Sequence, residues 1–229
     1  MIFTWNRPAP DGGSGTEEQV VGFDRQRSVR VMVLPAWFDE ANKLRRFTIE
    51  VMRRLDRAGI DAMLPDLPGC NESLAPLAEQ TLEGWRVAAL AAAEALRATH
   101  VLAIRAGALL APEGLPGWHY AAQSGPKLLR WMIRGRTIAS REAGLSETSE
   151  ALLAIGRSKG LTLGGWTIGA ELVRALESAE PTLSPTQSEI TQSMLGGPGL
   201  WLRAEPDDDA AQADALAAII ADSVSGAAA

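Results

Sequence analysis

Apolar runs alternate with amphipathic stretches along the first half of this chain. Residues 29–34 form an apolar, β-branched run ended by Pro35, which is typical of a buried strand. Residues 42–58 carry apolar side chains at helical spacing, with basic side chains between them, until Gly59 ends the pattern. Further segments follow in the same alternation: a strand at 60–67, a helix at 81–98, and strands at 100–104 and 117–121. This alternation predicts an α/β protein with a mostly parallel sheet flanked by helices.

The second half departs from that regular alternation. Residues 124–156 have a helical pattern, as expected for a small helical cap inserted after a strand of the sheet. Later strands are expected at 161–166 and 200–204, and a final helix at 210–223. The length of 229 residues suits one domain that contains this cap.

Two stretches rich in small or polar residues are expected to lie outside the core. Residues 11–26 begin with Asp-Gly-Gly-Ser-Gly and predict a turn and linker after a short first strand. Residues 225–229 predict a flexible C-terminal tail.

The composition of the chain limits which classes of partner and which cellular compartment are expected. The net charge of −6 disfavours a nucleic-acid partner, which normally selects a basic surface. No run of 18 apolar residues is present, so no transmembrane segment is expected, and the first residues lack the pattern of a signal peptide. Cys70 is the single cysteine, which excludes an intramolecular disulfide and favours a reducing, cytoplasmic location.

Residues 101–111, VLAIRAGALLA, have the layout of a nucleophile elbow. In that motif a strand turns sharply into a helix and projects one side chain, which requires small residues on both sides. Ala103 and Gly107 are the small residues here, and Arg105 takes the projecting position. Arginine stays protonated in proteins and cannot attack a carbonyl. The pattern therefore indicates a hydrolase-like fold without the usual nucleophile.

Several blocks in the chain resemble the exosortase A system-associated hydrolase 2 family. They are LPAWFDEANKLRR at 34–46, LPDLPGCNES at 64–73, IRAGALL at 104–110, and Trp201 with EPDD at 205–208. The resemblance implies an α/β-hydrolase-like fold and a role in bacterial gene clusters for exopolysaccharide and protein sorting. Members similar to this chain also tend to carry arginine at the elbow. The family name implies hydrolysis by fold analogy alone, and the family's setting implies an acyl or anionic ligand.

A catalytic triad of the usual kind is not expected. The acid position is available to Glu205 or Asp207, which follow the strand expected at 200–204. The histidine position of the triad cannot be filled, because His100 and His119 both lie far upstream in the sequence.

Other nucleophiles and cofactors have weaker support. Cys70 and Ser73 follow the Pro-Gly turn after a strand, but a passive thiol and a turn hydroxyl are the favoured roles. No spacing suggests a metal site, and no cofactor is expected.

Two roles remain open for Arg105. It either anchors an anionic ligand at the carboxyl end of the sheet, or forms an internal ion pair with Asp39 or Glu40. In the first case the neighbouring loop and helix start are expected to shape the mouth of the site, through Trp37, Phe38, Asp39, Glu40, Asn42 and Lys43.

The cap has a basic side that stands out in an acidic protein. Within 126–141, Lys127, Arg130 and Arg134 gather opposite an apolar side. Such a helix either simply covers the domain or meets a membrane surface, an acidic carrier protein or an anionic ligand.

Three functions follow from these features. The preferred one is a catalytically degenerate α/β-hydrolase-like protein that binds an anionic or acyl ligand, or a partner, in an exosortase A-linked exopolysaccharide system. The alternatives are a hydrolase or acyltransferase of esterase or thioesterase type with an unconventional nucleophile, and a structural subunit that holds a partner enzyme through the cap helix.

Overall fold

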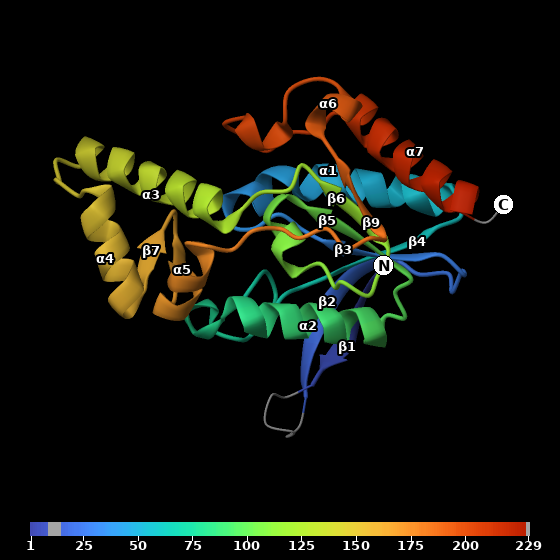
Figure 1. The fold of residues 1–229 in the computed structure, drawn as a ribbon, viewed down its shortest axis with the longest axis horizontal. Coiled ribbons are helices and arrows are strands. Elements are labelled where there is room, and N and C mark those ends of the chain that lie inside the picture. The colour runs from blue at the N-terminus through green and yellow to red at the C-terminus, as the bar shows by residue number, and fades with distance from the viewer. Residues whose placement is uncertain (9–14, 228–229) are drawn as a thin grey trace.

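A seven-stranded sheet forms the centre of the protein in the computed structural model, which describes residues 1–8 and 15–227 (Figure 1). Its strand order is β1-β2-β4-β3-β5-β6-β9. The strands are β1 (Ile2–Arg7), β2 (Thr16–Phe23), β3 (Arg30–Leu34), β4 (Asp61–Pro65), β5 (His100–Ile104), β6 (Gly117–Tyr120) and β9 (Gln187–Ile190). The five strands from β4 to β9 are parallel, whereas β2 is antiparallel to β4 and to β1. The predicted mostly parallel sheet is confirmed.

Helices cover both faces of this sheet. The helices α1 (Asp39–Arg57) and α7 (Ala210–Ala227) lie on one face, and α2 (Leu82–Ala95) lies on the other (Figure 1). The strand β3 is buried along its whole length, because Val31 and Val33 pack toward α1 while Met32 and Leu34 pack toward α2. The apolar side of α1, which includes Leu44 and Phe47, supplies much of the core between the sheet and the helices α1 and α7.

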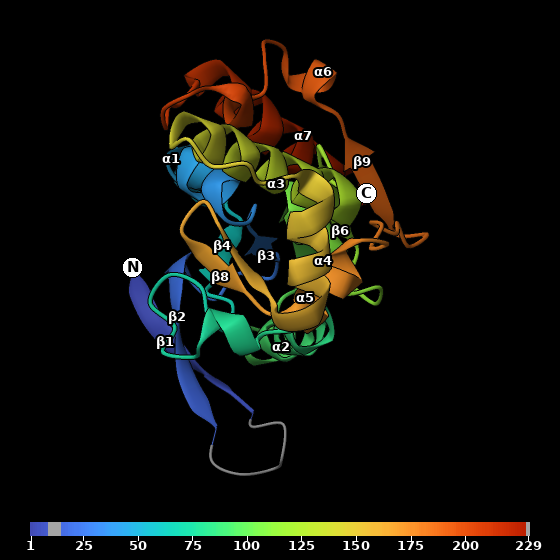
Figure 2. The same cartoon turned by 90° about the vertical axis from the view of Figure 1, so that its left-hand side faces the viewer.

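Between β6 and β9 the chain leaves the sheet and builds the cap. It contains α3 (Gly125–Glu142), α4 (Ser149–Lys159), the hairpin of β7 (Leu161–Leu163) and β8 (Trp166–Ile168), and α5 (Ala170–Leu176). Figure 2 shows these elements together at one end of the molecule, in front of the sheet. The excursion is therefore longer than the helical segment expected at 124–156. The prediction of a single strand at 161–166 is wrong. Residues 164 and 165 form the turn between β7 and β8, which pair as a separate two-stranded sheet.

Three other expectations are corrected near the ends of the chain. The strand expected at 200–204 is a short 3-10 helix, η3 (Leu200–Leu202), and the last strand of the sheet is β9. Most of the linker expected at 11–26 is the strand β2, while residues 9–14 lie outside the described residues. The expected tail at 225–229 begins inside α7, which extends to Ala227; residues 228–229 are not described.

Three short helical segments complete the fold. They are η1 (Leu77–Glu79), η2 (Arg105–Leu110), which directly follows β5, and α6 (Gln192–Leu195). Across the described part of the chain, no helix is long and apolar enough to cross a membrane.

Candidate functional site

The elbow forms where β5 ends and η2 begins. Arg105 has a φ of 55°, a left-handed backbone that a residue with a Cβ adopts only under strain. Two residues later the chain passes close behind β3, since a Cβ on Gly107 would lie 2.5 Å from the carbonyl oxygen of Leu34. The small residue expected at 107 is thus required by backbone contact, and the turn projects the Arg105 side chain at the carboxyl end of the sheet.

The Arg105 guanidinium is held on three sides. Its Nε and Nη2 donate to the two carboxylate oxygens of Glu40 at 2.9 and 3.0 Å. Its Nη1 donates to the carbonyl oxygen of Ala121 at 2.8 Å, and the Trp201 ring lies 4.0 Å from its central carbon. The side chains of Arg105 and Glu40 are 12% and 6% exposed. This bidentate ion pair occupies the place where an anionic ligand was expected.

Glu40 reaches the pair because of where α1 begins. The helix starts at Asp39, three residues earlier than expected, so that both Asp39 and Glu40 lie in its first turn. Acidic side chains are favoured there by the helix dipole. Of the two candidate partners for Arg105, only Glu40 is used. The Asp39 carboxylate instead pairs with the Lys43 ammonium at 2.9 Å, and that ammonium lies 5.1 Å from the centre of the Trp131 ring.

The aromatic residues before α1 are part of the core. Trp37 and Phe38 are 3% and 4% exposed. Trp37 packs against Trp85 of α2 at a ring separation of 4.8 Å, and Phe38 packs against Trp166 of the cap hairpin at 5.8 Å. These two side chains join the sheet, α2 and the cap to one another.

A small cavity lies beside this aromatic cluster. Trp37, Phe38, Asn42, Cys70 and Trp166 are among its lining residues, and its volume is about 40 Å³. Arg105 and Glu40 are not among them. Sites for small molecules usually have about 300–1,000 Å³, so this cavity is too small to hold a substrate.

The two alternative nucleophiles, Cys70 and Ser73, lie in the loop after β4. Burial raises the pKa of the Cys70 thiol to about 12, and the nearby carboxylates of Asp66 and Glu18 act in the same direction. The Ser73 hydroxyl oxygen accepts hydrogen bonds from the backbone N–H of Gly69 at 3.0 Å and of Ala75 at 3.3 Å. Ser73 therefore stabilises the loop after β4.

The histidines lie in the sheet, apart from these side chains. His100 in β5 stacks on Trp118, and its Nδ1 hydrogen-bonds to Thr99. His119 in β6 is 1% exposed, and burial lowers the pKa of each imidazole. Within residues 1–8 and 15–227, neither ring hydrogen-bonds to Cys70 or Ser73. Among the described residues, therefore, neither histidine is positioned as a general base for Cys70 or Ser73.

The expected acid residues lie on the surface of the protein. Glu205 and Asp207 are exposed in the loop after η3, and Asp207 forms an ion pair with Arg203. The sequence predicts a strand directly before them, but the preceding segment is the 3-10 helix η3. Trp201 from the same segment is the residue that reaches Arg105. It was not expected to belong to the site, although its presence in one of the family-like blocks was a signal.

Comparison with known proteins identifies the fold. No protein-family model matches the sequence, and no curated protein is similar to it at a significant level. Among solved structures, the alpha/beta hydrolase domain-containing protein 10 from mouse is similar over 99% of both chains, with a TM-score of 0.56 and 15% identity. A putative hydrolase from Agrobacterium vitis is similar over 99% of this chain and 98% of its own, with a TM-score of 0.51 and 12% identity. An esterase from Thermogutta terrifontis is similar over 99% and 97%, with a TM-score of 0.50 and 8% identity.

These likenesses define the class of the protein. The chain has an α/β-hydrolase fold, which agrees with the expected fold class. At 8–15% identity the similarity concerns the fold, and activity has to be argued from the site itself.

Proposed function

We propose that this protein is a non-hydrolytic member of the α/β-hydrolase fold that acts by binding an anionic or acyl ligand, or a partner. One observation carries the proposal: Arg105 occupies the elbow and is locked to Glu40, Ala121 and Trp201. Ser-His-Asp hydrolysis needs a nucleophile at that position and a base beside it. A guanidinium in a bidentate pair serves neither purpose.

The surroundings of the other nucleophiles support binding over catalysis. A cysteine attacks as its thiolate, and with a pKa of about 12 the Cys70 thiol stays protonated near neutral pH. The Ser73 oxygen accepts two backbone hydrogen bonds and has no base beside it within the described residues. The alternative of an esterase or thioesterase with an unconventional nucleophile therefore has no observation in its favour.

The proposed setting rests on the sequence. The blocks at 34–46, 64–73 and 104–110 support a role in an exosortase A-linked exopolysaccharide system. The single cysteine supports a cytoplasmic location.

An esterase assay tests the proposal. The purified protein is incubated with p-nitrophenyl esters of acetate, butyrate and decanoate and with a decanoyl thioester. We expect no turnover above buffer for the wild type and for the matched variants Cys70→Ala and Ser73→Ala. Turnover by the wild type that either substitution removes would overturn the proposal and establish the alternative enzyme.

A further inference from the structure

The cap contains a groove that is separate from the elbow. It lies between α3 and α4, ends at Glu177 after α5, and has a volume of about 390 Å³. Its apolar lining includes Leu129, Ile133 and Leu153, and its polar lining includes Arg130, Arg134 and Ser149. This volume falls within the range of about 300–1,000 Å³ that is usual for small-molecule sites, whereas the cavity beside the aromatic cluster is smaller.

The floor of the groove is apolar and deep. Leu129 and Ile133 are each 3% exposed, although both line the groove, and Leu153 of α4 is partly buried. Because Leu129 and Ile133 are almost fully buried, the floor does not form a broad exposed apolar patch. A slender aliphatic chain reaches it, whereas a partner helix needs a wider apolar surface.

Positive charge is left uncompensated along one wall. Arg130 and Arg134 are exposed and one helical turn apart on α3, so their Cβ atoms lie about 6 Å apart on the same side. The neighbouring arginines of the cap, Arg136 and Arg157, are paired with Glu147 and Glu177. Within residues 1–8 and 15–227, Arg130 and Arg134 have no ion-pair partner. Two unpaired arginines in a chain of net charge −6 favour an anionic group between them.

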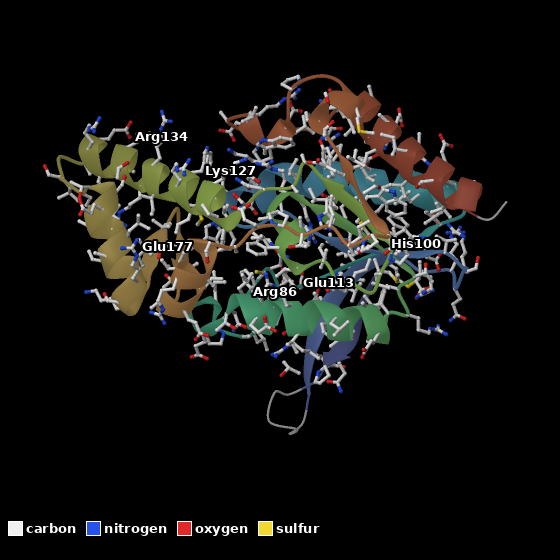
Figure 3. The ribbon with its side chains drawn as sticks, in the orientation of Figure 1. Arg86, His100, Glu113, Lys127, Arg134 and Glu177 are labelled. Atoms are coloured by element: carbon white, nitrogen blue, oxygen red, sulfur yellow. The ribbon has the colours of Figure 1, made fainter. Side chains whose placement is uncertain are left out.

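The groove has a direction. Arg136 and Ser140 hydrogen-bond to Glu147, which places the start of α4, with Ser149, beside the outer part of α3. At the opposite end of α4, Arg157 holds Glu177. Figure 3 shows Arg134 toward the outer end of α3 and Lys127 nearer the sheet. The end near Arg134 and Ser149 therefore suits an anionic head, helped by the positive N-terminus of α4, and the apolar floor continues from there toward Glu177.

We infer that this groove binds a free single-chain anionic amphiphile, with its carboxylate or phosphate head at Arg130, Arg134 and Ser149 and its aliphatic chain on Leu129, Ile133 and Leu153. The inference rests on the proposed function, because it makes the cap, and not the elbow, the place where an acyl ligand is bound. The ligand keeps its chemical structure, so no reacting group is required beside it.

Calorimetric titration with sodium decanoate, kept below its micelle concentration, tests the inference. We expect one decanoate per protein, and much weaker binding of acetate, which lacks the chain, and of octyl glucoside, which lacks the charge. Arg130→Ala and Arg134→Ala should each weaken decanoate binding by about tenfold or more, since each removes a charged hydrogen-bond donor from the head. Arg141→Ala is the matched control: it removes an exposed arginine of α3 that does not line the groove.

Several outcomes would overturn the inference. They are no decanoate binding by the folded wild type, equal binding by all variants, and binding to phosphatidylglycerol vesicles that monomeric decanoate does not displace. The last result would assign the basic side of α3 to a membrane surface.

This failure is distinct from a failure of the proposed function. If decanoate does not bind and esters are not hydrolysed, only the groove assignment falls. If esters are hydrolysed and Cys70→Ala or Ser73→Ala stops the reaction, the proposed function is wrong, whether or not decanoate binds.

Discussion

Arg105 and Glu40 join the elbow to the first turn of α1 through two parallel hydrogen bonds of 2.9 and 3.0 Å. In an active hydrolase of this fold the elbow presents a nucleophile to the substrate. Here the same geometry presents a cation to an internal carboxylate, and both side chains are nearly buried. The ion pair therefore joins the end of β5 to the first turn of α1.

Removal of either partner of the Arg105–Glu40 ion pair should destabilise the protein strongly. Glu40→Ala leaves a nearly buried guanidinium without its counter-ion, and Arg105→Ala leaves the carboxylate, so each should lower the free energy of unfolding by about 3–5 kcal/mol. The double variant Arg105→Leu/Glu40→Leu should lose less than either single variant, since no uncompensated charge remains. Urea denaturation measures all three.

The control for this comparison is Arg53→Ala. Arg53 pairs with Glu50 on the surface and is 52% exposed, so its loss should change the free energy of unfolding by less than about 1 kcal/mol. Single variants of Arg105 and Glu40 that behave like Arg53→Ala would show that the pair is not structural.

Cys70 should be nearly unreactive in the folded protein. With a thiol pKa of about 12 the thiolate is scarce at pH 8, whereas the unfolded chain has an ordinary cysteine pKa near 8.5. Alkylation by iodoacetamide at pH 8 should be more than about 100-fold slower in the native state than in guanidinium chloride. The native rate should still be rising with pH at pH 10, and a plateau below pH 9 would contradict the raised pKa.

Asp24 should make folding sensitive to acid. Hydrogen bonds from Arg30 lower the pKa of Asp24 to about 2 in the folded protein, against about 3.9 in the unfolded chain. The folded-state pKa is depressed, so the stabilisation is fully present above about pH 4 and is lost as the pH falls toward 2. Asp24→Asn should therefore be less stable than the wild type at pH 7, and the difference should shrink by pH 2–3 in denaturation curves.

Asp222→Asn serves as the control for the acid experiment. Asp222 is exposed on α7, outside the ion pairs of the described residues, and its replacement should change the free energy of unfolding at pH 7 by less than about 0.5 kcal/mol. Parallel curves for wild type and Asp24→Asn would disprove the role of the Arg30–Asp24 pair.

Gly107 should tolerate no side chain. A Cβ there would lie 2.5 Å from the Leu34 oxygen and 2.6 Å from the Pro35 oxygen, so the backbone behind the elbow would have to move. Gly107→Ala should lower the free energy of unfolding by about 1–3 kcal/mol. Gly135→Ala in α3, where a Cβ meets nothing within 4 Å, should instead stabilise the protein by about 0.5–1 kcal/mol. Thermal denaturation of the two variants distinguishes these opposite signs.

Elements with strong periodicity were predictable, and those with mixed polarity were not. The strands β3, β4, β5 and β6 have apolar runs, and α1 has a continuous apolar side. In β2 the alternation is hidden because Glu18 occupies a buried position, where Arg7 of β1 neutralises it. The edge strand β9 buries only Gln187 and Ile190, which is too few apolar positions to give a pattern. The segment at 200–204 was wrongly predicted as a strand, because the short apolar run at 200–202 does not distinguish a strand from a helix.

The sequence by itself determined the parallel core, the tight elbow at 103–107 and the cation at its tip, because each depends on local periodicity or on the chemistry of single residues. The tertiary structure decided which carboxylate Arg105 meets. Asp39 and Glu40 are neighbours in sequence, and the starting point of α1 turns the first toward Lys43 and the second toward the elbow. Only the folded chain brings Trp201 over Arg105 and aligns α3 with α4 into a groove. Trp201 lies 96 positions after Arg105 in the sequence, and local periodicity does not determine a contact between residues so far apart.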